Sequence, residues 1–183
     1  MDYTKINERE ITSMFTDTGK TIRSFTDNEA WSSKIKKLAH IMKDKQHMFL
    51  IGKGDAFYTA LEGALKIKEI SYIHAEAFAG GELKHGCIAL IEKNTPVIVI
   101  SSKKTRKDIL SNAMELKSRG AYIVGIDEID NETYDYHIHV PELGKLNSLI
   151  QVLPLQLFAY HLALAKNLDP DKPRNLAKSV TVK

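Results

Sequence analysis

Three charged residues at helical spacing are the strongest candidates for chemistry in this chain. Glu62, Lys66 and Glu69 follow one another at intervals of four and three residues, and Ile73 continues the series. On an α-helix these positions share roughly one face, so the two carboxylates and the ammonium group would lie side by side. A carboxylate beside an amine can move a proton and stabilise the charge that remains. The alternative is an ordinary solvated face with an ion pair worth about 0.3–0.5 kcal/mol.

Two short polar segments could bind an anion. Gly52, Lys53 and Gly54 follow an apolar run, and glycines between a strand and a helix can present backbone N–H groups to a phosphate. This segment lacks the full spacing of a P-loop or of a dinucleotide-binding motif. Ser101 and Ser102 follow another apolar run and suit either an anion or the cap of the following helix.

The histidines and the single cysteine are weaker candidates. His85 lies in an expected loop and can exchange protons near neutral pH, but most loop histidines are only solvated. His137 and His139 alternate along an expected strand and would share a face, although no cysteine or third histidine at ligand spacing completes a zinc site. His161 lies in an apolar helix, which favours a hydrogen-bonded core histidine. Cys87 precedes three apolar residues and is interpreted as a small buried side chain rather than a nucleophile.

The elements expected to position these residues alternate between helices and strands. We expect helices over residues 7–25, 27–43, 55–73, 106–119 and 147–166. Asp55 is expected to cap the third helix, and Pro154 to interrupt or kink the last. We expect strands over residues 48–54, 96–102, 121–126 and 136–140. A glycine-containing loop at residues 79–81 precedes a short helical piece at 82–91.

This alternation predicts an α/β domain built as a three-layer α/β/α sandwich with a mainly parallel sheet. We predict a helical N-terminal arm at residues 1–44, the α/β domain at 45–168 and an extended C-terminal tail at 169–183. In such a sheet, ligands bind in the crevice at the carboxyl ends of the strands. We therefore expect residues 52–54, residues 101–102 and the loops near Asp127 at that edge.

Composition excludes several classes of protein. Of the 183 residues, 43% are hydrophobic and 27% charged, the balance of a globular protein rather than a disordered or fibrous one. A formal net charge of +3 does not demand nucleic acid or an anionic membrane as a partner. The first residues lack a secretory pattern, and the apolar runs are interpreted as too short to span a bilayer. A single cysteine suits a reducing compartment, so the cytoplasm is the expected location.

Two long segments carry a family resemblance. EGALKIKEISYIHAEAFAGGELKHG (residues 62–86) and DKPRNLAKSVTVK (residues 171–183) closely resemble the carboxyl-terminal half of the glutamine–fructose-6-phosphate aminotransferases, or glucosamine-6-phosphate synthases. The resemblance implies a flavodoxin-like sugar isomerase (SIS) domain, the second of two that follow a glutaminase domain in that family. It also implies synthesis of glucosamine 6-phosphate and glutamate from fructose 6-phosphate and glutamine, without a metal or organic cofactor.

The resemblance assigns roles to five residues. Lys178 matches the lysine that forms a Schiff base with the open-chain keto sugar, whose iminium makes the C1 protons acidic. Glu69 matches the carboxylate that moves a proton between C1 and C2, and Lys66 matches the lysine that stabilises negative charge at the enolamine stage. His85 matches a histidine associated with ring opening, which the neighbouring subunit supplies in that family. Ala177 matches a backbone position that contacts the substrate.

Departures from the family pattern limit what we expect of this chain alone. The glutaminase nucleophile is an N-terminal cysteine, whereas this chain begins with Met1 and Asp2, and Cys87 stands where the family usually has proline. The loop that grips the sugar phosphate belongs to the first SIS domain. We therefore expect little or no turnover in the absence of the glutaminase and first SIS domains. The histidine that a neighbouring subunit supplies in that family implies a homodimer. The alternatives are a non-catalytic module that binds a sugar phosphate and a platform for dimerisation.

Overall fold

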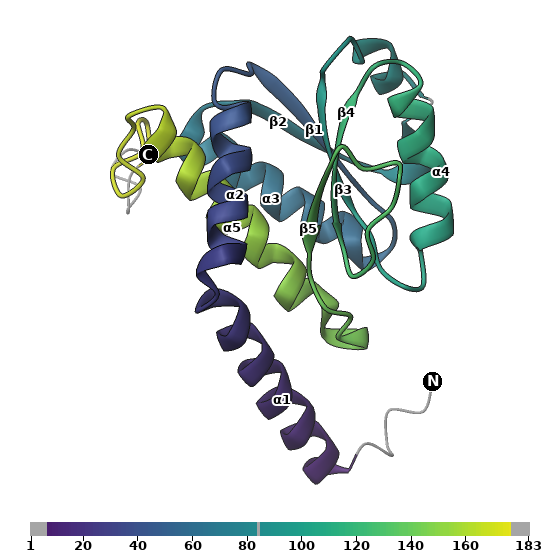
Figure 1. Ribbon diagram of the computed structural model, residues 1–183, viewed down its shortest axis with the longest axis vertical. Helices are drawn as coiled ribbons and strands as arrows, with labels where there is room; N and C mark the ends of the chain where they lie inside the picture. The colour runs from purple at the N-terminus through teal and green to yellow at the C-terminus, as the bar shows by residue number, and fades with distance from the viewer. Residues whose placement is uncertain (1–6, 84, 177–183) are drawn as a thin grey trace, which may run out of the picture.

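A computed structural model describes residues 7–83 and 85–176 of the chain. In this part of the chain, five parallel strands form the middle layer of the molecule (Figure 1). Their order in the sheet is β2-β1-β3-β4-β5. The strands are β1 (His47–Gly52), β2 (His74–Ala79), β3 (Pro96–Ile100), β4 (Tyr122–Asp127) and β5 (Tyr136–His139). The predicted α/β fold with a parallel sheet is confirmed.

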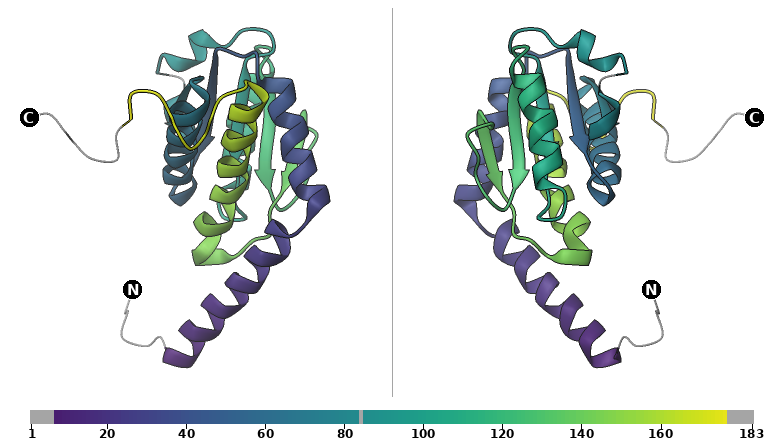
Figure 2. Two further views of the ribbon diagram at one scale, coloured as in Figure 1. Left: turned by 90° about the vertical axis from the view of Figure 1, so that its left-hand side faces the viewer. Right: turned by 90° about the vertical axis from the view of Figure 1, so that its right-hand side faces the viewer.

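Helices cover both faces of this sheet, as Figures 1 and 2 show. One face carries α2 (Glu29–Met42), α3 (Asp55–Ser71) and α5 (Asn147–Ala165), and the other carries α4 (Arg106–Lys117). Successive strand residues point to opposite faces. Leu50 therefore packs in the core under α2, α3 and α5, whereas Phe49 and Ile51 pack in the core under α4. Burial on both faces explains the continuous apolar runs in β1 and β3.

Strand β2 is absent from the sequence-based prediction. The sequence suggested a helix up to residue 73 followed by a loop, whereas α3 ends at Ser71 and β2 pairs with β1 from His74 to Ala79. Three of the six residues of β2 are alanines, so the segment lacks the β-branched residues that usually mark a strand. Pairing with β1, rather than local propensity, makes it a strand.

The turn between β1 and α3 depends on glycine. A Cβ atom on Gly52 would lie 2.3 Å from the carbonyl oxygen of Ala56, and Gly54 has a φ of +63°. Both positions therefore exclude larger residues or strain them. Gly54 is the N-cap of α3, and no side chain caps this end of the helix. The expectation that Asp55 caps the helix is wrong, because Asp55 already belongs to the first turn.

Helix α5 continues through Pro154. Residues Gly144–Ala165, which also include the 3-10 turn η4 (Gly144–Leu146), are long and apolar enough to cross a membrane by length and composition alone. The interpretation that every apolar run is too short for a bilayer is therefore wrong. Nine residues of α5 are buried, however, and the helix packs against α2 and α3, as is typical of a core helix in a globular domain.

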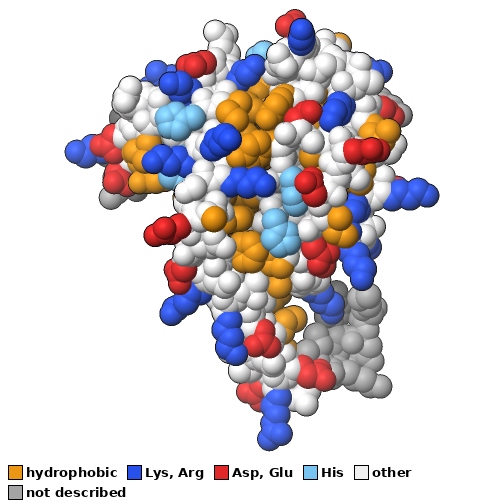
Figure 3. All heavy atoms as spheres, in the orientation of Figure 1, with side chains coloured by type: hydrophobic (Ala, Val, Ile, Leu, Met, Phe, Trp, Pro, Cys, Tyr) orange, Lys and Arg blue, Asp and Glu red, His pale blue; other side chains and the backbone are white. Residues whose placement is uncertain are grey.

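Helix α1 (Glu8–Thr26) projects away from the sandwich and meets it through α2 (Figure 1). Figure 3 shows acidic and basic side chains interspersed along this projection, so neither sign of charge dominates it. Asn28 caps α2, because its Oδ1 accepts from the Trp31 backbone N–H at 3.0 Å. The Trp31 indole N–H donates to the His139 carbonyl oxygen at 2.9 Å and joins α2 to the edge strand β5.

His161 on α5 is not the hydrogen-bonded core histidine that the sequence suggested. Its Nε2 is buried and has no hydrogen-bond partner in the described part of the chain. Burial, together with the nearby charges of Lys36 and His40 on α2, holds the pKa of His161 below its ordinary value. The folded protein therefore binds a proton at His161 less readily than the unfolded chain does.

We predict that lowering the pH from about 7.5 to about 5 costs the wild-type protein more stability than it costs the His161→Gln variant. In the unfolded chain His161 takes up a proton at about pH 6.5, whereas in the folded protein it does so only at lower pH. The free energy of unfolding, measured with urea at both pH values, should therefore fall less in the variant. His74→Gln, which removes an exposed histidine, is the matched control variant. Identical pH dependence in wild type and His161→Gln would contradict this assignment.

Candidate active site

The carboxyl-terminal half of α3 brings the three predicted charged residues together. Lys66 Nζ lies 2.7 Å from Glu69 Oε2 and 3.8 Å from Glu62 Oε1. The three side chains are between 30% and 43% exposed, so a ligand can reach them. The hydrogen bond with Glu69 outweighs desolvation and raises the pKa of Lys66 above its ordinary value. Lys66 therefore stays positively charged at neutral pH beside a carboxylate that can accept a proton.

The C-terminal tail returns to this end of α3. The helix is followed by Tyr72, which adopts a left-handed φ of +60°. The backbone N–H of Arg174 donates to the Tyr72 hydroxyl at 2.9 Å, and the Arg174 guanidinium lies 4.1 Å from the centroid of the Tyr72 ring. These contacts anchor the tail three residues beyond Glu69. Lys178 and Ala177 follow the anchor in sequence but lie outside the described residues.

His85 lies at the opposite edge of the sheet. Because α3 runs antiparallel to β1 and β2, Glu69 lies at the amino edge of the sheet. His85 follows β2 at the carboxyl edge, between the 3-10 turns η2 (Gly80–Glu82) and η3 (Cys87–Leu90). Its side chain is 72% exposed, and its Nε2 lies 4.0 Å from Glu82 Oε2. One chain therefore does not bring His85 to Lys66 and Glu69, and a role at that site requires a second subunit.

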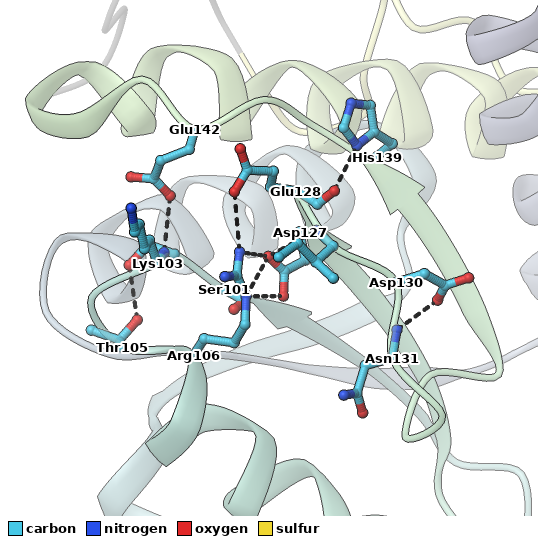
Figure 4. Close-up of polar contacts among 12 residues, drawn as sticks. Ser101, Lys103, Thr105, Arg106, Asp127, Glu128, Asp130, Asn131, His139 and Glu142 are labelled. Atoms are coloured by element: carbon cyan, nitrogen blue, oxygen red, sulfur yellow. Dashed lines mark hydrogen bonds and ion pairs between the residues drawn. The ribbon is translucent and has the colours of Figure 1, made fainter.

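A buried ion pair at the carboxyl edge was not predicted from the sequence. Asp127, at the end of β4, is fully buried and accepts hydrogen bonds from Arg106 Nε at 3.1 Å and Nη2 at 2.6 Å (Figure 4). The Tyr134 hydroxyl also donates to it at 2.9 Å. Burial raises the pKa of Asp127, but the hydrogen bonds, led by Arg106, outweigh burial and hold the pKa below its ordinary value. Because Arg106 begins α4, this pair fixes the loop after β3 against β4.

A cleft of about 300 Å³ opens at the carboxyl ends of β1 and β3. We name it the switch-point cleft, because the helices that follow β1 and β3 cover opposite faces of the sheet. Three segments line it: Lys53 and Asp55 after β1, Ser102 and Lys104 after β3, and Lys145 and Gln151 near the start of α5. Of the residues predicted to bind an anion, Lys53, Gly54 and Ser102 therefore lie in one cleft.

The two histidines of β5 contact the backbone. His137 Nε2 lies 2.9 Å from the carbonyl oxygen of Asp127, and His139 Nδ1 lies 2.9 Å from that of Glu128. Within residues 7–83 and 85–176, no group of three or more His, Cys, Asp or Glu side chains is arranged to hold a metal ion. Cys87 is half-buried rather than buried, and desolvation raises the pKa of its thiol, which disfavours the nucleophilic thiolate.

Comparison with known proteins identifies the fold family. Residues 41–166 match the family model of the SIS domain. The chain belongs to the SIS domain family. This match covers the sheet and all the helices that pack against it except most of α2, and it confirms the SIS domain implied by residues 62–86 and 171–183.

Individual relatives of this SIS domain are aminotransferases. The chain is 51% identical over 152 residues to glutamine–fructose-6-phosphate aminotransferase (isomerizing) of Thermococcus kodakarensis, and 46% identical over 155 residues to that of Escherichia coli K12. Each alignment covers 81% of this chain but only 25% and 26% of the relative. The SIS domain therefore spans about a quarter of the length of the curated relatives that it matches.

A solved structure supports the same relationship. The C-terminal domain of glucosamine-fructose-6-phosphate aminotransferase from Francisella tularensis superposes with a TM-score of 0.76 at 31% identity. The superposition covers 91% of this chain and 49% of that one. The resemblance to the carboxyl-terminal part of these aminotransferases is thereby confirmed.

We predict that Tyr72→Ala releases the tail. The variant loses a hydrogen-bond acceptor and a cation–π contact, together worth about 1–2 kcal/mol, so local opening at Arg174 should become roughly tenfold more frequent. The rate of tryptic cleavage after Arg174, followed by intact-protein mass spectrometry, measures this opening. Tyr72→Phe keeps the ring and should show a smaller increase. Tyr58→Ala removes an exposed tyrosine from the same helix and should change nothing, whereas unchanged cleavage in Tyr72→Ala would refute the anchor.

Proposed function

We propose that this SIS domain is the second of two in a glutamine–fructose-6-phosphate aminotransferase and provides half of the site that isomerises a ketose phosphate. The observation that carries the proposal is the Lys66–Glu69 contact beside the anchored C-terminal tail. Helix α3 supplies a carboxylate and a fixed positive charge. The tail continues for four residues past Arg174 to the amine of Lys178.

In the proposed mechanism, the Lys178 amine attacks the C2 carbonyl of open-chain fructose 6-phosphate, and water leaves as the iminium forms. Ammonia released from glutamine then adds to C2 and displaces the Lys178 amine, which leaves an iminium that carries the transferred nitrogen. This iminium withdraws electrons from C1, so Glu69 can move a proton from C1 to C2. Lys66, 2.7 Å from Glu69, stabilises the negative charge that develops at the enolamine stage. Ala177 contacts the substrate through its backbone. The product, glucosamine 6-phosphate, therefore keeps the nitrogen that came from glutamine, and Lys178 is regenerated as a free amine.

The remaining parts of the site come from outside one copy of this chain. We propose that His85 of a neighbouring subunit assists ring opening, which fits its exposure at the opposite edge of the sheet and implies a homodimer. A glutaminase domain supplies ammonia, and a first SIS domain holds the sugar phosphate. The isolated SIS domain should then show little turnover. We expect the enzyme to need no cofactor and to reside in the cytoplasm.

A sugar-phosphate-binding module without chemistry is the second candidate function. The switch-point cleft favours it, because this cleft lies away from Lys66 and Glu69 and needs neither residue. Such a module would bind sugar phosphates equally well after Lys178→Ala. The aminotransferase proposal instead requires the Lys178 amine for chemistry.

The aminotransferase proposal predicts a sharp difference between two carboxylates on one helix. We would replace the matching quarter of the Escherichia coli aminotransferase with this SIS domain and measure the rate at which the exchanged enzyme forms glucosamine 6-phosphate. Glu69→Gln should lower its formation by roughly 10²- to 10⁴-fold, because the proton-transfer group is lost. Glu62→Gln removes the other carboxylate beside Lys66, at 3.8 Å, and should cost less than about tenfold.

Two results would contradict this proposal. Equal losses in Glu69→Gln and Glu62→Gln would show that Glu69 has no special role. Full activity after Lys178→Ala would remove the Schiff base from the mechanism. Glutaminase activity and the circular dichroism of each protein establish that it is folded, so a folded exchange protein without isomerase activity also counts against the proposal.

A further inference from the structure

Apolar residues occur on every side of α5, although one chain buries only part of this helix. Its 19 residues include no Asp, Glu, Lys or Arg, and nine of them are buried. Figure 2 shows α5 in the middle of the helical layer, between α2 and α3, so one side of it faces away from the sheet. A helix that is hydrophobic all round is normally covered on all sides. The outward side of α5 is therefore exposed where such a helix would be covered.

The outward side of α5 carries a row of mainly apolar residues, which we name the α5 seam. Leu149, Leu153, Gln156, Tyr160 and Leu164 follow one another at intervals of three and four residues. These intervals place them on one face, as in the contact between two packed helices. Leu149, Tyr160 and Leu164 are each between 43% and 45% exposed, so a large part of each side chain remains available for contact.

The helix on the opposite face of the sheet has a different outer surface. Of the four exposed residues of α4, Lys107, Asp108 and Ser111 are polar and only Met114 is apolar. Of the four exposed residues of α5, three are apolar. Water is a suitable neighbour for α4, whereas the α5 seam has the composition of an interface core, which is apolar and poor in charge.

The helical layer offers enough area for a stable contact between two copies of the chain. α3 and α5 contain 17 and 19 residues and pack side by side. At about 1.5 Å per residue and about 10 Å in width for each helix, they present roughly 500–600 Å². Leu61 and Leu65 of α3 are exposed and extend the apolar area. Two copies would together bury about 1,000–1,200 Å², which reaches the lower end of specific interfaces.

The α5 seam is complementary to itself when the second α5 runs antiparallel to the first. A two-fold axis between residues 156 and 157 sets Leu149 opposite the partner's Leu164. The same axis sets Leu153 opposite the partner's Tyr160. Each of these apolar contacts occurs twice, because the two copies contribute the same surface.

Charges at the two ends of α5 favour the same antiparallel direction. Lys145 precedes the helix, Asp169 follows it, and both side chains are exposed. The two-fold axis brings Lys145 near the partner's Asp169 at each end of the seam. A parallel pairing would instead bring Lys145 near the partner's Lys145, and like charges repel. Opposite charges therefore meet at both ends of an apolar contact only in the antiparallel arrangement.

An antiparallel pairing also relates the two edges of the sheet. α5 begins at the carboxyl edge, where Gln151 donates to the carbonyl oxygen of Ser101, and it ends at the amino edge beside Tyr72. Reversal of α5 in the second copy brings the partner's carboxyl edge to the level of the amino edge of the first copy. The partner's His85 then lies at the edge that carries Glu69, as a site shared between subunits requires.

We propose that a second copy of this chain covers the α5 seam, with the two α5 helices antiparallel about a two-fold axis. The proposal rests on the proposed function for its choice of partner, because that function requires a neighbouring subunit. It goes beyond that function in naming the surface through which the subunit binds. Both copies use the same surface, so the assembly closes as a dimer.

Sedimentation equilibrium of the chain over a range of concentrations tests the proposal. We expect a particle of twice the mass of the chain. Leu164→Glu should raise the dissociation constant of the dimer by about a hundredfold or more, because the substitution occurs twice and leaves a charge in an apolar contact. Met114→Glu replaces an exposed apolar side chain of α4 and should leave the dissociation constant unchanged. A monomeric wild type, or equal effects of the two substitutions, would overturn the interface.

Mixtures of charged variants test the antiparallel alignment. Leu149→Lys and Leu164→Glu should each be monomeric alone and should form a heterodimer when mixed, a gain of association that misfolding cannot produce. Leu149→Lys mixed with Leu149→Glu should stay monomeric, because residue 149 faces the partner's residue 164. Association of the second mixture, or of neither, would refute the proposed alignment. Because the readout is mass rather than activity, a failed interface leaves the comparison of Glu69→Gln with Glu62→Gln to decide the proposed function.

Discussion

Helix α3 lies between two parallel strands and has to run antiparallel to both. A right-handed crossover between neighbouring parallel strands permits no other course. Its amino end therefore lies at the carboxyl edge of the sheet, where free N–H groups face the switch-point cleft, and its carboxyl end carries Lys66 and Glu69 to the amino edge. One helix thus separates the switch-point cleft from the residues that we propose for proton transfer. The positions of the cleft and of Lys66 and Glu69 both depend on that direction.

Local periodicity was enough to predict much of this arrangement. The contact of Lys66 with Glu69 follows from helical spacing, since residues three and four apart meet on a helix surface. The position of Lys53 and Ser102 at one edge follows from the rule that ligand-binding turns lie at the carboxyl ends of parallel strands. These features depend on neighbours in sequence or on the general topology of a parallel sheet, and a single sequence contains both kinds of information.

Contacts between distant segments could not be predicted in this way. Arg106 pairs with Asp127 across 21 residues, and Tyr72 holds Arg174 across 102 residues, so no local pattern connects either pair. Strand β2 was not predicted either, because its alanine-rich sequence does not favour a strand and becomes one only through pairing with β1. The tail, a polar segment with two prolines between residues 169 and 176, is held at α3 by contacts that composition does not encode.

The central claim is that α3 and the C-terminal tail form two parts of one reacting site. Borohydride reduction in the presence of fructose 6-phosphate, with the SIS domain exchanged into the Escherichia coli aminotransferase, tests it most directly. Peptide mass spectrometry should find one sugar-phosphate adduct on Lys178. The adduct should persist in Glu69→Gln, because that carboxylate acts after the Schiff base forms. An adduct scattered over surface lysines, or none on Lys178 in the folded enzyme, would contradict the account.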